Sequence, residues 1–142
     1  MLVILKQVMT TNVVTVGMDT TLREIRDTFE KHTFHHLLVV ERGKLVGVIS
    51  DRDLLKNLSP FLGTVSENTR DSALLKRHAH QIMRRSPITA MPSTDVLDAC
   101  STFVEKGISC LPVVEETGQV VGIVTWRDIL RLLLEIKKPS SK

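Results

Sequence analysis

No apolar run in this sequence approaches the roughly 18 residues that a helix needs to span a bilayer. Residues 1–6 have no basic n-region, and their apolar stretch is too short for a secretory signal peptide. We therefore expect a cytoplasmic protein with no membrane partner. Cysteine is also scarce. Cys100 and Cys110 are expected to be two small buried thiols, because a disulfide is unfavourable in a reducing compartment.

The chain also lacks a strong excess of one charge. Its 19 basic and 16 acidic residues leave a formal net charge of +3, and the charges are interspersed, which is not typical of a nucleic-acid-binding surface. With 42% hydrophobic and 25% charged residues, the composition is that of a globular protein with enough apolar material for a core. A length of 142 residues suits one compact domain.

The most informative feature is an internal repeat. Residues 9–41 align with residues 83–115 at a constant offset of 74, and after one extra residue 43–55 align with 118–130. Fifteen of the 46 aligned positions are identical. Shared composition would not also preserve order and spacing, so we interpret the chain as two copies of one structural unit.

Each copy predicts the same order of elements, β-α-β-β-α. The first helix of each copy is predicted from apolar residues at i, i+3 and i+7, which share one helical face. These residues are Leu22, Ile25 and Phe29 in the first copy and Val96, Ala99 and Phe103 in the second. The other expected elements are strands 13–16, 37–40 and 45–49 with helix 51–58, and strands 88–90, 111–114 and 120–124 with a helix from 126 to about 137.

A unit of about 50 residues can hardly bury a core by itself, so we expect the two copies to pack sheet to sheet. The predicted fold class is α+β, with two tandem β-α-β-β-α repeats related by pseudo-twofold symmetry. The predicted organisation is repeat 1 at 1–58, a linker with a short helix at 59–78, repeat 2 at 79–138 and a frayed tail at 139–142.

The sharpest motif stands where a strand meets a helix in each copy. It reads Gly-apolar-apolar-Ser/Thr-x-Arg-Asp, at 47–53 and at 122–128. Free N–H groups and the positive end of the helix dipole at such a place suit a phosphate. A carboxylate can accept hydrogen bonds from a ribose diol, a hydroxyl can serve ribose or phosphate, and an arginine can neutralise a phosphate. The residues with these groups are Ser50, Arg52, Asp53, Thr125, Arg127 and Asp128.

The same motif has a second interpretation. Ser/Thr-x-x-Asp at the start of a helix is also a capping signature, and capping by itself would explain both hydroxyls and both carboxylates.

The sequence resembles a pair of cystathionine-β-synthase (CBS) domains, a Bateman module. The resemblance covers about residues 5–58 and 79–135. It is carried by Val8-Met9-Thr10 and Ile82-Met83 ahead of the first strands, by the Leu-Pro-Val-Val run at 111–114, and by the Gly-x-Leu/Val-Val-Gly and Gly-apolar-apolar-Ser/Thr-x-x-Asp patterns. It implies a non-catalytic regulatory sensor that binds AMP, ADP, ATP or an S-adenosyl ligand such as S-adenosylmethionine in clefts between the repeats.

The resemblance also implies roles for individual residues. Asp53 and Asp128 would hold ribose hydroxyls, and Ser50 and Thr125 would contact ribose or phosphate. His35 would approach the phosphates. The adenine pockets would be lined by Val14, Thr15, Ile88, Thr89, Val48 and Ile123. Which first strand serves which aspartate stays open.

Two departures from the pattern concern the clefts: the first affects the shape of one cleft, and the second predicts that the two clefts bind unequally. Leu38 stands where the second copy has Pro112 and where the family usually has proline, and Trp126 stands where the first copy has Asp51. Related modules pair through their helices, and residues 132–134 add an apolar run to the last helix. We therefore expect a homodimer that signals to an effector protein in trans.

Two rival functions remain open. One is a structural interaction or dimerisation module with vestigial clefts, and a less favoured one is a nucleic-acid-binding dimer. No nucleophile–base–acid arrangement or P-loop is visible, so no catalytic residue and no required cofactor are predicted. The chain has five histidines, His32, His35, His36, His78 and His80. No metal site is predicted from them, since a site needs three or four ligands in compatible geometry.

Overall fold

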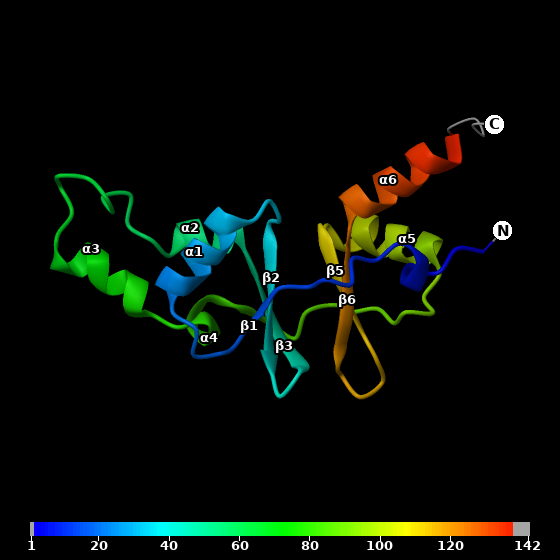
Figure 1. The fold of residues 1–142 in the computed structure, drawn as a ribbon, viewed down its shortest axis with the longest axis horizontal. Coiled ribbons are helices and arrows are strands. Elements are labelled where there is room, and N and C mark those ends of the chain that lie inside the picture. The colour runs from blue at the N-terminus through cyan, green and yellow to red at the C-terminus, as the bar shows by residue number, and fades with distance from the viewer. Residues whose placement is uncertain (1, 138–142) are drawn as a thin grey trace. The chain divides into compact units, whose positions relative to one another are not determined.

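The computed structural model describes residues 2–137, and its helices and strands confirm the predicted α+β class (Figure 1). Contacts divide the chain into two compact units. One unit is Val14–Pro87, and the other joins the start of the chain, up to Val13, to the part that follows from Ile88. The tail at 139–142, expected to be frayed, lies outside the described residues. Within 2–137, no helix is both long and apolar enough to cross a membrane.

The Val14–Pro87 unit is built on a four-stranded sheet with the order β1-β2-β3-β4. Its strands are β1 (Thr15–Val16), β2 (His36–Glu41), β3 (Lys44–Ser50) and β4 (Arg84–Arg85). β1 runs parallel to β2, and the other neighbouring pairs are antiparallel. The helices are α1 (Leu22–Lys31), α2 (Asp51–Lys56), α3 (Thr69–Ala73) and α4 (Ala79–Ile82), with a 3₁₀ turn η2 (Leu74–Lys76) after α3.

The core of this unit follows from the apolar spacing of its elements. Leu22 and Ile25 of α1 are fully buried, and Phe29 packs against them partly buried. Thr21 caps α1, since its side chain accepts a hydrogen bond from the Glu24 N–H. The helix thus begins at Leu22, the first residue of the predicted apolar face. The buried core residues of the unit are Leu22, Ile25, Leu37, Val39, Ile49, Leu54, Ala79 and Met83.

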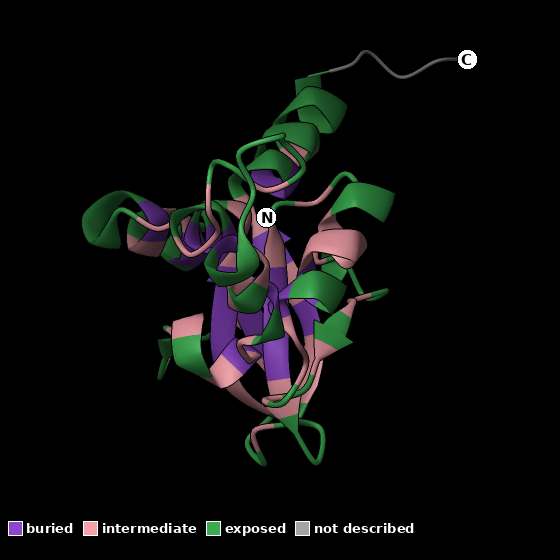
Figure 2. Cartoon of the chain, turned by 90° about the vertical axis from the view of Figure 1, so that its left-hand side faces the viewer, coloured by how far each residue is buried: buried purple, intermediate pink, exposed green. Residues whose placement is uncertain are grey.

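The other unit repeats this plan with shorter edges. The antiparallel strands β5 (Cys110–Val114) and β6 (Val120–Thr125) form its sheet, and α5 (Val96–Lys106) and α6 (Trp126–Lys137) are its helices. Ala90 forms a parallel bridge to Val113 and Thr10 an antiparallel bridge to Ile123. These two bridges occupy the places that β1 and β4 hold in the first unit. The core residues are Leu5, Val96, Ala99, Phe103, Leu111, Val113, Val124 and Ile129; Figure 2 shows how burial concentrates on the strands.

The segment ahead of each first strand belongs to the sheet of the other repeat. Thr10 precedes β1 in sequence but bonds to Ile123, whereas Arg84–Arg85 precede the second copy's first strand but pair with β3. The 3₁₀ turn η1 (Leu5–Gln7) lies in the same N-terminal arm as Thr10, the segment that ends at Val13. The compact units and the sequence repeats therefore have different bounds, and each unit includes the opening segment of the other repeat.

Candidate functional site

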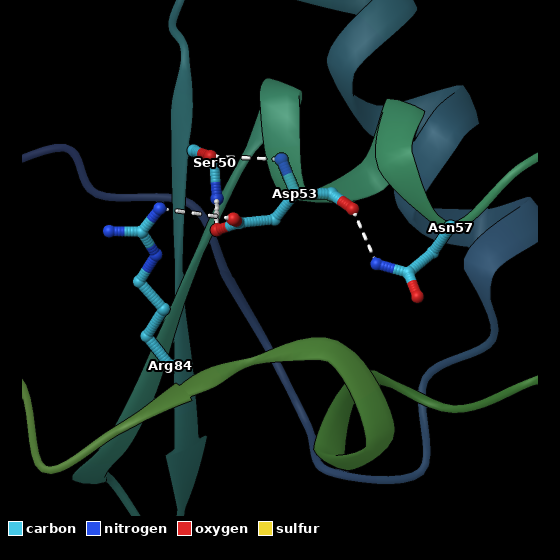
Figure 3. Close-up of polar contacts among 4 residues, drawn as sticks. All are labelled: Ser50, Asp53, Asn57 and Arg84. Atoms are coloured by element: carbon cyan, nitrogen blue, oxygen red, sulfur yellow. Dashed lines mark hydrogen bonds and ion pairs between the residues drawn. The ribbon is translucent and has the colours of Figure 1, made fainter.

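The candidate site of the first repeat is organised around Asp53, at the start of α2 (Figure 3). Ser50 is the N-cap residue of this helix. Its Oγ accepts a hydrogen bond from the Asp53 N–H at 3.0 Å, and Asp53 Oδ2 accepts one from the Ser50 N–H at 3.0 Å. This reciprocal pair is a capping box, so the capping interpretation of the motif is confirmed here. The hydrogen bond from the Ser50 N–H occupies Oδ2, one of the two carboxylate oxygens of Asp53.

The second repeat builds the same arrangement at the start of α6. The Thr125 N–H donates to Asp128 Oδ2 at 2.9 Å, and Thr125 Oγ1 accepts from the Asp128 N–H at 3.4 Å. Both aspartates are buried, with exposed fractions of 8% for Asp53 and 7% for Asp128. Two buried carboxylates are thus held in equivalent positions by equivalent bonds.

The remaining oxygen of each carboxylate faces an arginine, and the two arginines have different origins. Asp53 Oδ1 accepts a hydrogen bond from Arg84 Nη2 at 3.3 Å, across 31 positions of sequence (Figure 3). Asp128 Oδ1 accepts one from Arg131 Nη1 at 3.2 Å, one turn further along α6. Neither arginine is among the site residues predicted from the sequence. The i, i+3 spacing was a usable signal for Arg131, whereas nothing local in the sequence links Arg84 to Asp53.

The arginines of the motif itself, Arg52 and Arg127, lie on the first turns of α2 and α6 and are exposed. They do not share in the capping hydrogen bonds at either aspartate.

The environment keeps Asp53 ionised. Burial raises the pKa of its carboxyl, but the hydrogen bonds from Ser50 and the charge of Arg84 together outweigh burial. The net pKa of Asp53 is therefore lowered from the ordinary value of 3.8. At neutral pH this carboxylate is a charged acceptor, and hydroxyl donors bond more strongly to a charged acceptor than to a neutral one.

The predicted pocket-lining residues of the first unit fall on one row of the sheet. Thr15 pairs with Leu38, Leu38 with Val48, and Val48 with Arg84, so the row crosses all four strands. Thr15 is exposed, Val48 is buried, and Val14 is half-buried just ahead of β1. The structure therefore brings Thr15 and Val48 into the sheet that leads to Asp53, with Val14 next to it in sequence.

The second unit has the matching row. Pro112 pairs with Ile123, and Ile123 bonds in turn to Thr10. Ile88 and Thr89 are exposed ahead of the Ala90 bridge, and Ile123 is half-buried. Each first strand thus shares a unit with the aspartate of its own repeat. Leu38 and Pro112, the departure noted in the sequence, occupy equivalent register positions.

His35 stands beside the start of α2. Its Nδ1 lies 2.8 Å from Asp51 Oδ2, and its carbonyl oxygen accepts a hydrogen bond from the Asp51 N–H at 3.0 Å. The corresponding residues of the second repeat are Ser109 and Trp126, which cannot form an ion pair. The surroundings of Asp53 and Asp128 are therefore chemically different, as the sequence comparison of Asp51 with Trp126 predicts.

The largest separation from Asp53 along β3 is at the turn between β2 and β3, where the strand begins. A hollow of about 360 Å³ lined by Glu41, Arg42, Lys44 and Val46 is at the turn between β2 and β3, the opposite end of β3 from Ser50. In the described part of the chain, no group of three or more His, Cys, Asp or Glu residues is placed to hold a metal ion.

Comparison with known proteins identifies this architecture. The model of the CBS domain family matches residues 5–60 and 79–135. The chain belongs to the CBS domain family. A CBS domain-containing protein of Dictyostelium discoideum is 33% identical over 141 residues, which cover 98% of this chain and 97% of that protein. Several other curated relatives are longer, and the chain spans less than two thirds of their length.

Two solved CBS structures are similar over almost the whole chain. The CBS domain pair of protein MJ0100, in complex with 5′-methylthioadenosine and S-adenosyl-L-methionine, is 30% identical with a TM-score of 0.79, covering 96% of this chain and 100% of that one. CBSX2 in complex with AMP is 27% identical with a TM-score of 0.81, covering 95% and 99%. The tandem CBS fold is thus shown by sequence and by structure.

Proposed function

We propose that this chain is a non-catalytic regulatory module that binds an adenosyl ligand, with Asp53 and Asp128 holding the ribose hydroxyls. The observation that carries the proposal is that each repeat buries an aspartate at the same place and bonds it to a hydroxyl residue and an arginine. A ribose diol offers two donors to such a carboxylate, and those bonds are charge-assisted.

The ligands of the similar structures support the adenosyl group as the shared element. AMP, 5′-methylthioadenosine and S-adenosyl-L-methionine differ at the 5′ position but have the same adenine and ribose diol. In this chain, Ser50 and Thr125 would contact ribose or phosphate, with His35 near the phosphate. Val14, Thr15, Val48, Ile88, Thr89 and Ile123 would line the adenine pockets.

The test is thermal unfolding of the purified protein with AMP, ADP, ATP, S-adenosylmethionine and 5′-methylthioadenosine, with GTP as a non-adenine comparison. A ligand that binds the folded state adds about 2.7 kcal/mol at 100 times its dissociation constant and raises Tm. The double variant Asp53→Ala/Asp128→Ala should lose this shift.

Asp71 provides a matched control. It is also buried, and it forms the same reciprocal capping box with Asn68 at the start of α3, in the linker. Asp71→Ala should lower the Tm of the free protein and leave the ligand-induced shift intact. If both variants keep the shift, the aspartates do not hold the ligand. If no adenosyl compound shifts Tm at millimolar concentration, an interaction module without a ligand replaces the proposal.

A second function, self-association, is favoured by the exposed apolar residues of α6. Trp126, Leu130, Leu133, Leu134 and Ile136 are 47–66% exposed in the single chain, and a helix with so many exposed large apolar side chains is typical of an interface. We propose that a second copy covers it, giving a homodimer that would present the module to an effector protein in trans. Sedimentation should show a dimer that Leu133→Glu converts to monomer, and a monomeric wild type would refute it.

A further inference from the structure

Arg84 and Thr10 occupy equivalent places in the two units, but one side chain is charged and the other is neutral. The residue at this place therefore decides whether the sheet edge brings a positive charge towards the aspartate of its unit. Val48 pairs with Arg84 on β4, and Ile123, the residue equivalent to Val48, bonds to Thr10. The position that brings a guanidinium to Asp53 therefore brings a neutral hydroxyl residue to the sheet that leads to Asp128. Arg131, the partner of Asp128, belongs to α6 itself and corresponds to Lys56 in the first repeat.

The contact between Arg84 and Asp53 is suited to exchange. The Asp53 side chain is 11% exposed, but that of Arg84 is 69% exposed, and their atoms lie 3.3 Å apart. An ion pair with a largely solvated arginine contributes little to stability, so moving the guanidinium costs little. The guanidinium has five N–H donors in a planar fork that matches phosphate geometry.

We propose that Arg84 is a specificity-determining residue, which makes the Asp53 site select adenosyl ligands with an anionic 5′ group over uncharged ones. The inference rests on the proposed function. When ribose hydroxyls bond to Asp53 Oδ1, the guanidinium of Arg84 leaves that oxygen. A ligand with a 5′ phosphate offers the displaced guanidinium a new anionic partner. An uncharged adenosyl ligand takes the carboxylate and leaves the cation without one.

The matched probes are AMP and adenosine, which differ by the 5′ phosphate. Their dissociation constants are measured by isothermal titration calorimetry in full-length protein with Asp128→Asn, so that binding reports the Asp53 site. Asn at position 128 keeps an oxygen that can accept the capping hydrogen bond. In this background, Arg84→Thr should lower the preference for AMP over adenosine about tenfold, the size expected for one charge-assisted hydrogen bond. Arg84→Lys should keep part of it.

The neighbouring arginine is the control for general electrostatics. Arg85 also lies on β4 and is exposed, but its Nη2 donates to the His80 carbonyl oxygen rather than to Asp53. Arg85→Thr removes the same charge and should leave the AMP preference unchanged.

Each outcome separates the inference from the function on which it rests. If Arg84→Thr binds AMP and adenosine with the wild-type ratio, or if Arg85→Thr changes the ratio equally, the role of Arg84 is refuted while adenosyl binding stands. If the protein with intact aspartates binds neither AMP nor adenosine, the proposed function fails and the inference fails with it.

Discussion

Gly47 lies directly against the side chain of Met83, so that a Cβ atom at position 47 would stand 2.5 Å from the Met83 sulfur and 3.1 Å from the Arg84 carbonyl oxygen. Gly122 and Met9 repeat this relationship, with a Cβ at position 122 placed 2.7 Å from the Met9 sulfur. The glycine and the methionine recur in both copies because each edge segment packs on the strand of the other repeat. At Gly47, this packing also fixes the backbone from which Arg84 reaches Asp53.

Gly47→Ala should therefore destabilise the protein. The added methyl group meets the Met83 side chain and a backbone carbonyl, and overpacking of this kind costs about 1–3 kcal/mol. Gly17→Ala is the control, since the nearest atom to its Cβ would be Thr20 Oγ1 at 3.8 Å, an ordinary contact. Urea unfolding measures both. Equal stability of the Gly47→Ala variant and the wild type would contradict the packing described.

The arm at the start of the chain should be as important to stability as the core of the unit it joins. Leu5 is fully buried in the cluster that contains Phe103 and Leu111, whereas Leu2 is 67% exposed. Leu5→Ala is expected to cost about 2–5 kcal/mol in urea unfolding, as for other buried leucines. The same truncation at Leu2 should change stability by less than about 0.5 kcal/mol. Similar effects of the two substitutions would show that the arm does not pack on this core.

Stability should fall on mild acidification because of His36. Burial lowers the pKa of His36 from the ordinary value of 6.5, and the positive charges of His35 and Arg84 lower it further. The carboxylates of Asp51 and Asp53 raise this pKa, but the net shift is downward. Below pH 6.5 the unfolded chain therefore binds a proton at this position that the folded protein does not. The free energy of unfolding decreases as the pH falls from 6.5 towards the lower folded pKa.

Urea unfolding at pH 7.5 and pH 5.5 checks this sign. His36→Gln should lose less stability between these two values than the wild type does, because the unfolded glutamine variant has no imidazole to protonate there. Residual pH dependence from the other histidines is common to both proteins. An identical loss in wild type and variant would mean that His36 has no part in it.

The sequence predicts the central strands and the helix starts well because their signals are local. It overextends the first strand of each copy: the expected strand 13–16 is only Thr15–Val16, and the expected strand 88–90 is reduced to a bridge at Ala90. β5 and β6 lie within a residue of the expected runs, and α6 spans the predicted Trp126–Lys137. Helix starts follow from side-chain caps, as at Asp95, which accepts a hydrogen bond from the Leu97 N–H. α2 was expected to reach residue 58 but ends at Lys56; the following Asn57 donates from Nδ2 to the Asp53 carbonyl oxygen at 2.7 Å (Figure 3).

The long-range pairings escape sequence analysis. Arg84 meets Val48, and Thr10 meets Ile123, through one or two residues at a sheet edge. Such short edges have no periodicity to read. The repeat aligns Thr10 with Arg84, which shows that the positions are equivalent, but neither residue's partner is near it in sequence. The candidate aspartates could therefore be predicted, whereas the arginine at Asp53 emerges from the fold.

Ribose binding by the two aspartates is tested by equilibrium dialysis of AMP against the wild-type protein and the double variant Asp53→Asn/Asp128→Asn. Asparagine keeps an acceptor for the capping hydrogen bond and removes the charge that holds the ribose hydroxyls, and Asp71→Asn makes the same change at a capping box in the linker. We expect saturable AMP binding that Asp71→Asn retains and the double variant loses. Wild-type affinity for AMP in the double variant, or no binding by the wild type, would contradict it.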